Sequence, residues 1–211
     1  MAKAENGVLG PVRGKVANLI FSKNLDTYYV RSNPGTRSAP NEKEQNTRDS
    51  FGGISWAFLN PIKPFLRLSY KEVAKGNRML QAALSYLVKN ALDRDGKNLS
   101  TVDPSRMLVS RGSLGLSEDI AVSLSAGSLN FSWNPSAASA PYSNDDQLML
   151  MAYNVAEGKV ATSIGEASRR DGSASLSVAD LPAGSMHVYL SFLSFDRSKA
   201  SDSTYLGELE K

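Results

Sequence analysis

The 211-residue sequence contains no cysteine and a single histidine, His187. The absence of cysteine excludes disulfides, thiolate metal sites and a cysteine nucleophile. A single histidine excludes metal centres built from several histidines, and no G-x-S-x-G motif supplies a serine nucleophile. We interpret His187 as a strand residue that is packed on one side. The sequence therefore predicts a protein that is not an enzyme, with no catalytic residues, no cofactor, no metal site and no small-molecule substrate.

Long apolar runs are also missing. No stretch reaches the roughly 18 apolar residues of a membrane-spanning helix, and the opening "MAKAENGVLGPVRGK" has no apolar core of a secretory signal. We expect cytoplasmic synthesis without a signal peptide and no membrane insertion. A place in a released particle or filament is compatible with this expectation.

The charges are unevenly distributed along the chain. Residues 1–100 hold 16 Lys and Arg against 8 Asp and Glu, whereas residues 101–211 hold 8 against 13. The basic half could contact a polyanion, or it could contact the acidic half of another copy and give head-to-tail assembly. The third interpretation is that both halves simply have solvated charges.

The N-terminal region has the composition of a β-hairpin. The β-prone runs "KVANLIFS" and "TYYVRS" are separated by "KNLD", in which Asn24 and Asp26 favour a turn. Pro34 and Gly35 end the second run. The pattern predicts two antiparallel strands.

Helical patterns follow the predicted hairpin. Phe51, Ile54 and Phe58 have the i, i+3, i+7 spacing of a helix face, and Pro61 and Pro64 interrupt that helix. A second short segment is therefore expected from about residue 62. The run "NRMLQAALSYLVKNAL" has the clearest helical periodicity in the chain, with its asparagine at position 77 as the predicted N-cap.

The periodicity changes to that of strands from about residue 101. The runs "SLNFSW" and "SASLSV" alternate in polarity, and "HVYLSFLSF" continues this pattern. The run "QLMLMAYN" places Leu148, Leu150 and Ala152 on one side and Met149, Met151 and Tyr153 on the other. Turn-forming segments separate these runs. Short alternating strands of this kind predict a two-sheet sandwich of about 100 residues. The predicted class is α+β, with a basic hairpin and two to three helices over 1–100 and an acidic all-β domain over 101–211.

The C-terminal half resembles a fibronectin type III or immunoglobulin-like module. The resemblance rests on "LNFSW", which contains Trp133, and on "LPAGSMHVYLSF". Leu181, Pro182 and Gly184 match the Leu-Pro-Gly corner of that family. The tyrosine that follows the corner in the family is displaced here, because Tyr189 comes about two residues late. The resemblance implies an immunoglobulin-like sandwich for this half.

Nearly the whole chain also resembles an uncharacterised protein family of unknown function from Bacteroidota. The matching segments are "GPVRGKVAN", "YYVRSNP", "EKEQNTRDSF", "LVKNAL", "SNDDQLMLMAYN", "HVYLSFLSF" and "STYLGELE". The resemblance implies no activity, because the family has none assigned.

Two apparent ligand-binding motifs fail on spacing. Three residues separate Gly10 and Gly14 where a phosphate loop has four, and Val16 stands where that loop needs a hydroxyl. "DRDGKN" begins like a calcium loop at Asp93 but lacks the required glycine and glutamate positions, so we interpret it as a polar turn. We likewise interpret Asp145 and Asp146 as solvated residues at the start of a strand.

These observations predict a non-catalytic structural protein that assembles with itself through protein–protein contacts, as a subunit of a filament, a virion or a surface machine. The alternative is a nucleic-acid-binding protein that uses its basic hairpin. Both functions would use the cations and tyrosines of the N-terminal region, which are Arg13, Lys15, Lys23, Tyr28, Tyr29, Arg31 and Arg37.

Overall fold

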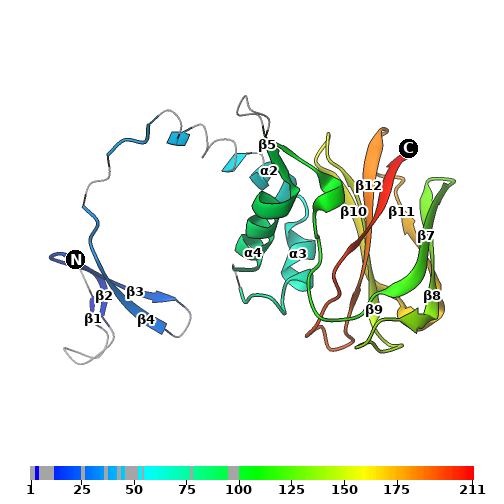
Figure 1. The fold of residues 1–211 in the computed structure, drawn as a ribbon, viewed down its shortest axis with the longest axis horizontal. Helices are drawn as coiled ribbons and strands as arrows, with labels where there is room; N and C mark the ends of the chain where they lie inside the picture. Colours follow the sequence, from blue (N-terminus) through cyan, green and yellow to red (C-terminus); the bar gives the residue numbers. More distant parts are fainter. Residues whose placement is uncertain are drawn as a thin grey trace. The chain divides into compact units, whose positions relative to one another are not determined.

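The computed structural model describes residues 3–4, 12–24, 27–35, 38–41, 44–45, 52–53, 55–76, 78–94 and 100–211. It contains two compact units, Met1–Glu42 and Lys43–Lys211 (Figure 1). The boundary predicted near residue 100 therefore falls inside the second unit.

The first unit is an antiparallel sheet with the strand order β1-β2-β3-β4. The last two strands are antiparallel neighbours, with the end of one opposite the start of the other, and the residues of the predicted turn at 25–26 lie outside the described residues. The strands are β1 (Lys3–Ala4), β2 (Val12–Val16), β3 (Leu19–Asn24) and β4 (Thr27–Ser32).

The run "KVANLIFS", predicted as one strand, contains a turn. Strand β2 ends at Val16 and β3 begins at Leu19, so only Ala17 and Asn18 connect them. Ala17 has a φ of 48°, a left-handed conformation that alanine adopts infrequently. The prediction missed this turn because Asn18 is its single turn-favouring residue and is flanked by apolar residues on both sides.

The helices begin near the predicted positions. Helix α2 covers Ser55–Leu59, α3 covers Lys63–Ser69 and α4 covers Arg78–Tyr86 before a π-helix at Leu87–Ala91. The break expected at the prolines is confirmed, and Pro64 occupies the first turn of α3, where a missing N–H breaks no helical hydrogen bond. The predicted helix residues 51 and 54, and the predicted cap at 77, lie outside the described residues.

The strands of the second unit form three antiparallel sheets. The smallest joins β5 and β6, and the other two have the orders β10-β9-β12-β13 and β11-β8-β7. Short 3-10 turns lie at Pro104–Arg106 and Arg169–Asp171. The strands are β5 (Leu92–Arg94), β6 (Ser100–Val102), β7 (Ser117–Ser125), β8 (Ser128–Ala138), β9 (Gln147–Asn154), β10 (Lys159–Ser168), β11 (Ser173–Ser177), β12 (Ser185–Leu193) and β13 (Thr204–Glu210).

The two larger sheets face each other around one apolar core. Their inward side chains come from alternate positions, as the period of a strand requires. Trp133 and Phe192 meet edge to face in this core, with ring centroids 6.0 Å apart. The core includes Leu129, Phe131, Trp133, Leu148, Leu150, Ala152, Leu176, Val188, Leu190 and Phe192.

A second core lies between the helices and the outer face of the β10-β9-β12-β13 sheet (Figure 1). Met149, Met151 and Tyr153 of β9 point into it, so this strand is buried on both faces. The Tyr153 hydroxyl donates a hydrogen bond to the Phe58 carbonyl at 3.1 Å, which links the sheet to α2. The helices share this core with the strands, and therefore they belong to the same compact unit.

The predicted α+β class is confirmed, with an N-terminal sheet, helices and then a mostly β region. Within the described residues, no helix is both long enough and apolar enough to cross a lipid bilayer.

Candidate interaction surface

The pairing register of the N-terminal sheet determines which side chains share a face. Lys15 pairs with Ile20, and Ile20 pairs with Arg31. Directly paired residues lie on the same face of a sheet, and Tyr29 is two residues from Arg31 on the same strand. We call the surface formed by Lys15, Ile20, Tyr29 and Arg31 the basic face.

The opposite face is mostly hydrophobic. Val16 pairs with Leu19, and Phe21 pairs with Val30. Val30 is 57% exposed, Val16 49%, Tyr28 48% and Leu19 44%, values that are high for large apolar side chains in a folded unit. We call the surface formed by Val16, Leu19, Phe21, Tyr28 and Val30 the apolar face.

One cation lies on the apolar face. Lys23 pairs with Tyr28 across β3 and β4, and its ammonium group is 5.2 Å from the centre of the Tyr28 ring. A cation over an aromatic face is attracted by the ring quadrupole. This attraction partly offsets the energetic cost of placing the charge of Lys23 beside apolar side chains.

The seven predicted contact residues do not form one patch. Lys15, Tyr29 and Arg31 share the basic face, whereas Lys23 and Tyr28 lie on the other face. Arg13 precedes a glycine whose φ of 114° interrupts the regular alternation of β2, so alternation does not assign it to a face. The seventh residue, Arg37, lies outside the described residues.

The first unit has no hydrophobic core among the residues that the structure describes. No described side chain between positions 12 and 41 is buried. All six residues of β4 are exposed, and this strand is at an edge of the sheet. Among the described residues of the first unit, nothing buries the apolar face, and no strand pairs with the outer edge of β4.

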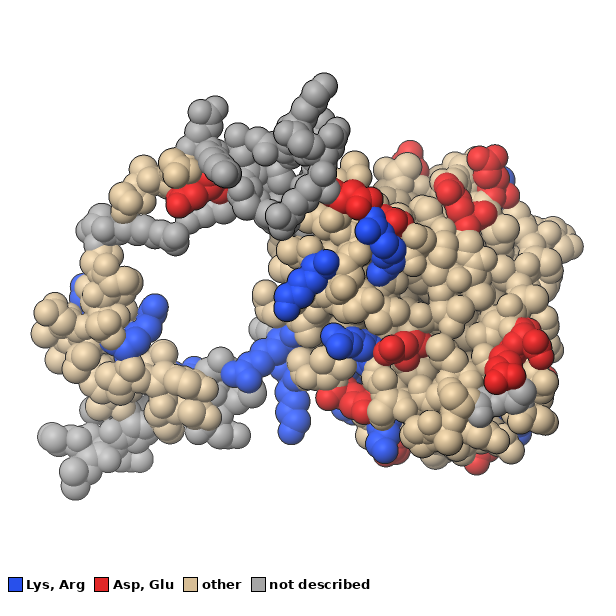
Figure 2. Space-filling view, viewed as in Figure 1, with Lys and Arg blue, Asp and Glu red and all other residues tan. Residues whose placement is uncertain are grey.

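The second unit separates its charges by region. Figure 2 shows, on the face in view, basic side chains mainly over the helices and acidic side chains mainly over the strands. The sequence agrees, since residues 43–100 hold ten Lys and Arg against five Asp and Glu. The charge asymmetry expected between two domains therefore lies largely within one compact unit.

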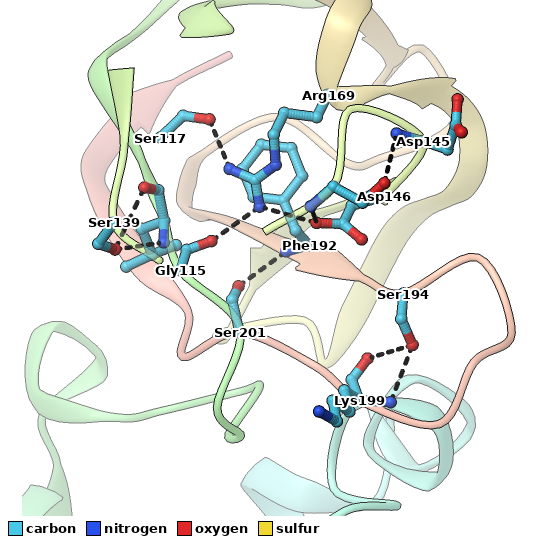
Figure 3. Close-up of polar contacts among 12 residues, drawn as sticks. Gly115, Ser117, Ser139, Asp145, Asp146, Arg169, Phe192, Ser194, Lys199 and Ser201 are labelled. Atoms are coloured by element: carbon cyan, nitrogen blue, oxygen red, sulfur yellow. Dashed lines mark hydrogen bonds and ion pairs between the residues drawn. The ribbon is translucent and has the colours of Figure 1, made fainter. Parts of the chain in front are cut away.

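A buried arginine organises one end of the strand region (Figure 3). The guanidinium group of Arg169 donates hydrogen bonds to the Ser117 hydroxyl at 2.8 Å and to the Gly115 carbonyl at 2.7 Å. Its central carbon lies 3.8 Å from the centroid of the Phe192 ring. The Arg169 carbonyl accepts a bond from the Trp133 indole at 2.7 Å. This residue joins β7, β8 and β12.

Asp146 supplies the negative charge beside this arginine. Its carboxylate is 3.4 Å from the Arg169 guanidinium and accepts a hydrogen bond from the Ser143 backbone at 2.8 Å. Burial lowers the pKa of Arg169, and the charge of Asp146 opposes that shift. Both side chains are almost fully buried, so the pair is a structural clamp rather than a ligand site.

The interpretation of Asp145 and Asp146 as two solvated residues is wrong for Asp146. Asp145 is exposed and pairs with Arg170 at 3.1 Å, whereas Asp146 turns inward to Arg169. The sequence contains two adjacent aspartates, Asp145 and Asp146, and two adjacent arginines at 169–170, which form the two ion pairs. This pattern could have indicated the pairing, but it could not show which member of each dipeptide is buried.

His187 also has a structural environment. Its Nδ1 atom lies 3.0 Å from the Tyr205 hydroxyl. Burial lowers the pKa of His187, and the charges of Glu208 and Asp103 oppose the shift.

A neighbouring open groove of about 400 Å³ is lined by Tyr205 together with Tyr86 and Arg106. The hydroxyl of the nearby Tyr189 donates a hydrogen bond to the Pro104 carbonyl at 2.7 Å, and not to the Leu-Pro-Gly corner.

Acidic residues do not gather into a metal site in the described part of the chain, where no group of three or more His, Asp or Glu side chains is suitably placed. Asp93 of the apparent calcium loop forms an ion pair with Arg106. The remaining oxygen donors of that loop, Asp95 and Asn98, lie outside the described residues. An open groove of about 430 Å³ has acidic lining residues, but one of them, Asp171, accepts hydrogen bonds from Ser168.

Comparison with known proteins places most of the chain in one group. Residues 11–207 match a protein family described as a family of unknown function, DUF6266. No match was found among curated proteins or among solved structures.

Proposed function

Because this chain belongs to the DUF6266 family, whose function is unknown, we propose from its structure that it is a non-catalytic, self-assembling structural subunit. Other copies of the chain cover its N-terminal sheet. The observation that carries this proposal is the exposed apolar face, in a unit whose described side chains include none that is buried.

Sheet energetics support the proposal. Small sheets are stable in water when a hydrophobic face is covered, and units of about 40 residues seldom bury enough surface on their own. The apolar face consists of large side chains on three neighbouring strands. Burying such side chains stabilises an assembly by roughly 25 cal/mol per Å² of apolar surface. A subunit of a filament, a virion or a surface machine is consistent with this proposal.

The test measures the mass of the intact chain by size-exclusion chromatography with light scattering over a wide concentration range. We expect oligomers or polymers. The informative variant is Leu19→Asp, which places a charge on the apolar face within the central strand β3. We expect it to shift the distribution to monomer, because a carboxylate resists burial in an apolar contact.

The matched control is Ser22→Asp, which adds the same charge to the same strand but on the basic face. Ser22 is exposed and pairs with Tyr29. The control should assemble like the original chain. A monomeric original chain at high concentration and low salt contradicts the proposal, as does equal assembly of Leu19→Asp and the original chain.

The strand order supports a finer assignment for part of the second unit. We infer that β7 to β13 form a fibronectin type III-like sandwich, with three strands in one sheet and four in the other. Trp133 lies in the core on the second of these strands. From the segments that resemble Bacteroidota sequences, such as "SNDDQLMLMAYN" and "HVYLSFLSF", we also infer a Bacteroidota origin for this chain. Neither inference assigns an activity, because this sandwich has many functions.

Nucleic-acid binding is the second candidate function, and the basic face favours it. Lys15 and Arg31 lie on either side of Ile20, beside the exposed ring of Tyr29, so cations and an aromatic platform share one surface. Such surfaces bind phosphates and stack on bases. The test is a titration with single-stranded DNA at increasing salt, comparing the original chain with Arg31→Gln. Absence of binding at low salt contradicts this candidate.

A further inference from the structure

The edge strand β4 has the properties of a homotypic pairing site. Thr27–Ser32 lies at an edge of the N-terminal sheet, where no described strand pairs with its outer side, and each of its six residues is exposed. Natural proteins protect such edges with proline, inward charges or very short strands. The sequence "TYYVRS" has no proline and a single charge, Arg31, near its end. This edge lacks those protections against pairing.

Symmetry restricts how two copies can pair along β4. Two antiparallel strands related by a two-fold axis normal to the sheet must place one residue opposite its own counterpart. Each face then continues across the junction, because directly opposite residues lie on the same side. The apolar faces of the two copies therefore join into one wider surface.

The side chains favour a register centred on Tyr29. It places Tyr29 opposite its counterpart, Tyr28 opposite Val30, and Thr27 opposite Arg31. Aromatic–aromatic and aromatic–β-branched cross-strand pairs stabilise a sheet. Centring on Val30 instead gives one β-branched pair and places Tyr28 opposite Ser32.

Charge disfavours the in-register parallel arrangement and is compatible with the antiparallel one. In-register parallel pairing would place the two Arg31 side chains directly opposite each other, which destabilises a sheet. The antiparallel register separates them by about 13 Å along the strand. The single charge of β4 therefore favours an antiparallel second copy.

The size of the apolar face also calls for an extended surface. Three strands of five or six residues give a patch of about 14 by 20 Å, whereas a standard interface buries about 800 Å² on each partner. Pairing along β4 doubles this patch without any change inside the unit. The wider surface is more suitable for a further copy to cover.

We propose that β4 of one copy pairs antiparallel with β4 of a second copy, centred on Tyr29, to form one continuous sheet. This inference rests on the proposed self-assembly and specifies its geometry. The occupant of the edge is a second copy of this chain, and the contacts are the backbone hydrogen bonds of the paired strands together with the cross-strand pairs of the Tyr29 register.

The absence of cysteine allows a direct test. A single introduced cysteine can form a disulfide only with another copy. Opposite Cα atoms in an antiparallel pair are about 4.5–5.5 Å apart, within the roughly 4.4–6.8 Å that a disulfide spans. Tyr29→Cys should therefore form covalent dimers under mild oxidation, measured as the rate of dimer formation on non-reducing gels.

Two matched variants complete the experiment. In the Tyr29 register, the Val30 positions of the two copies are offset by two residues along the strands. Their Cα atoms are therefore about 8 Å apart, which is beyond the range of a disulfide in Val30→Cys. Ser22 lies on β3, opposite Tyr29. The two β4 strands lie between the Ser22 positions of the two copies, so the cysteines of Ser22→Cys would be about 14 Å apart. We expect Tyr29→Cys to crosslink at least tenfold faster than either control. Circular dichroism of the three reduced variants checks that their folds agree.

The outcomes separate this inference from the proposed function. An oligomeric chain in which Tyr29→Cys crosslinks no faster than Ser22→Cys overturns the β4 pairing and leaves self-assembly standing. Faster crosslinking of Val30→Cys than of Tyr29→Cys overturns the register. A monomeric chain that does not crosslink overturns both proposals.

Discussion

The guanidinium of Arg169 stacks on the ring of Phe192, with 3.8 Å between its central carbon and the ring centroid. The contact places a full positive charge inside the strand region, where desolvation is costly. Hydrogen bonds to Ser117 and Gly115 and the carboxylate of Asp146 compensate that cost. The stability of this end of the fold therefore depends on each partner being present.

Replacing Arg169 by methionine tests this dependence. The variant leaves Asp146 buried without its cation, and breaking one side of a buried ion pair costs about 3 kcal/mol or more. We expect the free energy of unfolding, measured by urea denaturation, to fall by about that amount. Arg170→Met is the control, because Arg170 is exposed and pairs with the exposed Asp145. A surface pair of this kind contributes about 0–1 kcal/mol, and equal losses for the two variants contradict the prediction.

Gly115 should tolerate no side chain. A Cβ atom at this position would lie 1.4 Å from the Ser139 carbonyl oxygen, a backbone atom that cannot rotate away. We expect Gly115→Ala to lower the free energy of unfolding by about 3 kcal/mol, as in severe overpacking. The matched control is Gly53→Ala, where nothing lies within 4 Å of the new atom. Its effect should be within about 0.5 kcal/mol, and similar curves for the two variants would show that the loop moves aside.

The sequence predicted the strands of the second unit better than it predicted which elements pack against them. The pattern "QLMLMAYN" is apolar at every position from Leu148 to Tyr153, and such runs are typical of a strand buried on both sides. The periodicity of the sequence does not indicate which element covers the second face of this strand. The covering helices come from residues before position 100, so the domain boundary placed there separated two elements that share a core.

Long-range polar contacts were outside the reach of sequence patterns. Arg169 meets Ser117, which is 52 positions away, and Tyr153 meets Phe58, which is 95 positions away. Each contact depends on how the sheets and helices pack. The candidate surface was predicted only as a region, because the turn at Ala17 and the resulting strand register decide which cation lies on which face.

The hydroxyl of Tyr153 should contribute to the attachment of α2. Removing it in Tyr153→Phe leaves the buried Phe58 carbonyl without this donor and keeps the edge-to-face ring contact at 5.0 Å. Loss of one such hydrogen bond costs about 1 kcal/mol. Urea denaturation should show that decrease, whereas Tyr142→Phe, at an exposed ring, should unfold like the original chain. A decrease of the same size at both positions would assign it to something other than the buried bond.

His187 should make the stability of the protein depend on pH. Burial lowers the pKa of this residue in the folded state, whereas in the unfolded chain it is about 6.5. The unfolded state therefore binds more protons between these two values, so stability rises with pH through that window and is lost as pH falls through it. Carboxylates also titrate in acid, and comparison with His187→Gln removes their contribution, since both chains share them.

We expect the free energy of unfolding of the original chain to decrease more than that of His187→Gln between about pH 8 and pH 5. Glu208→Gln supplies a second comparison, because the Glu208 carboxylate favours the charged imidazole. Its removal should lower the pKa of His187 further and make the dependence steeper. Because His187 is the only histidine, its proton resonances report the same titration directly. Parallel pH profiles for the original chain and His187→Gln would show that His187 titrates equally in the folded and unfolded chain.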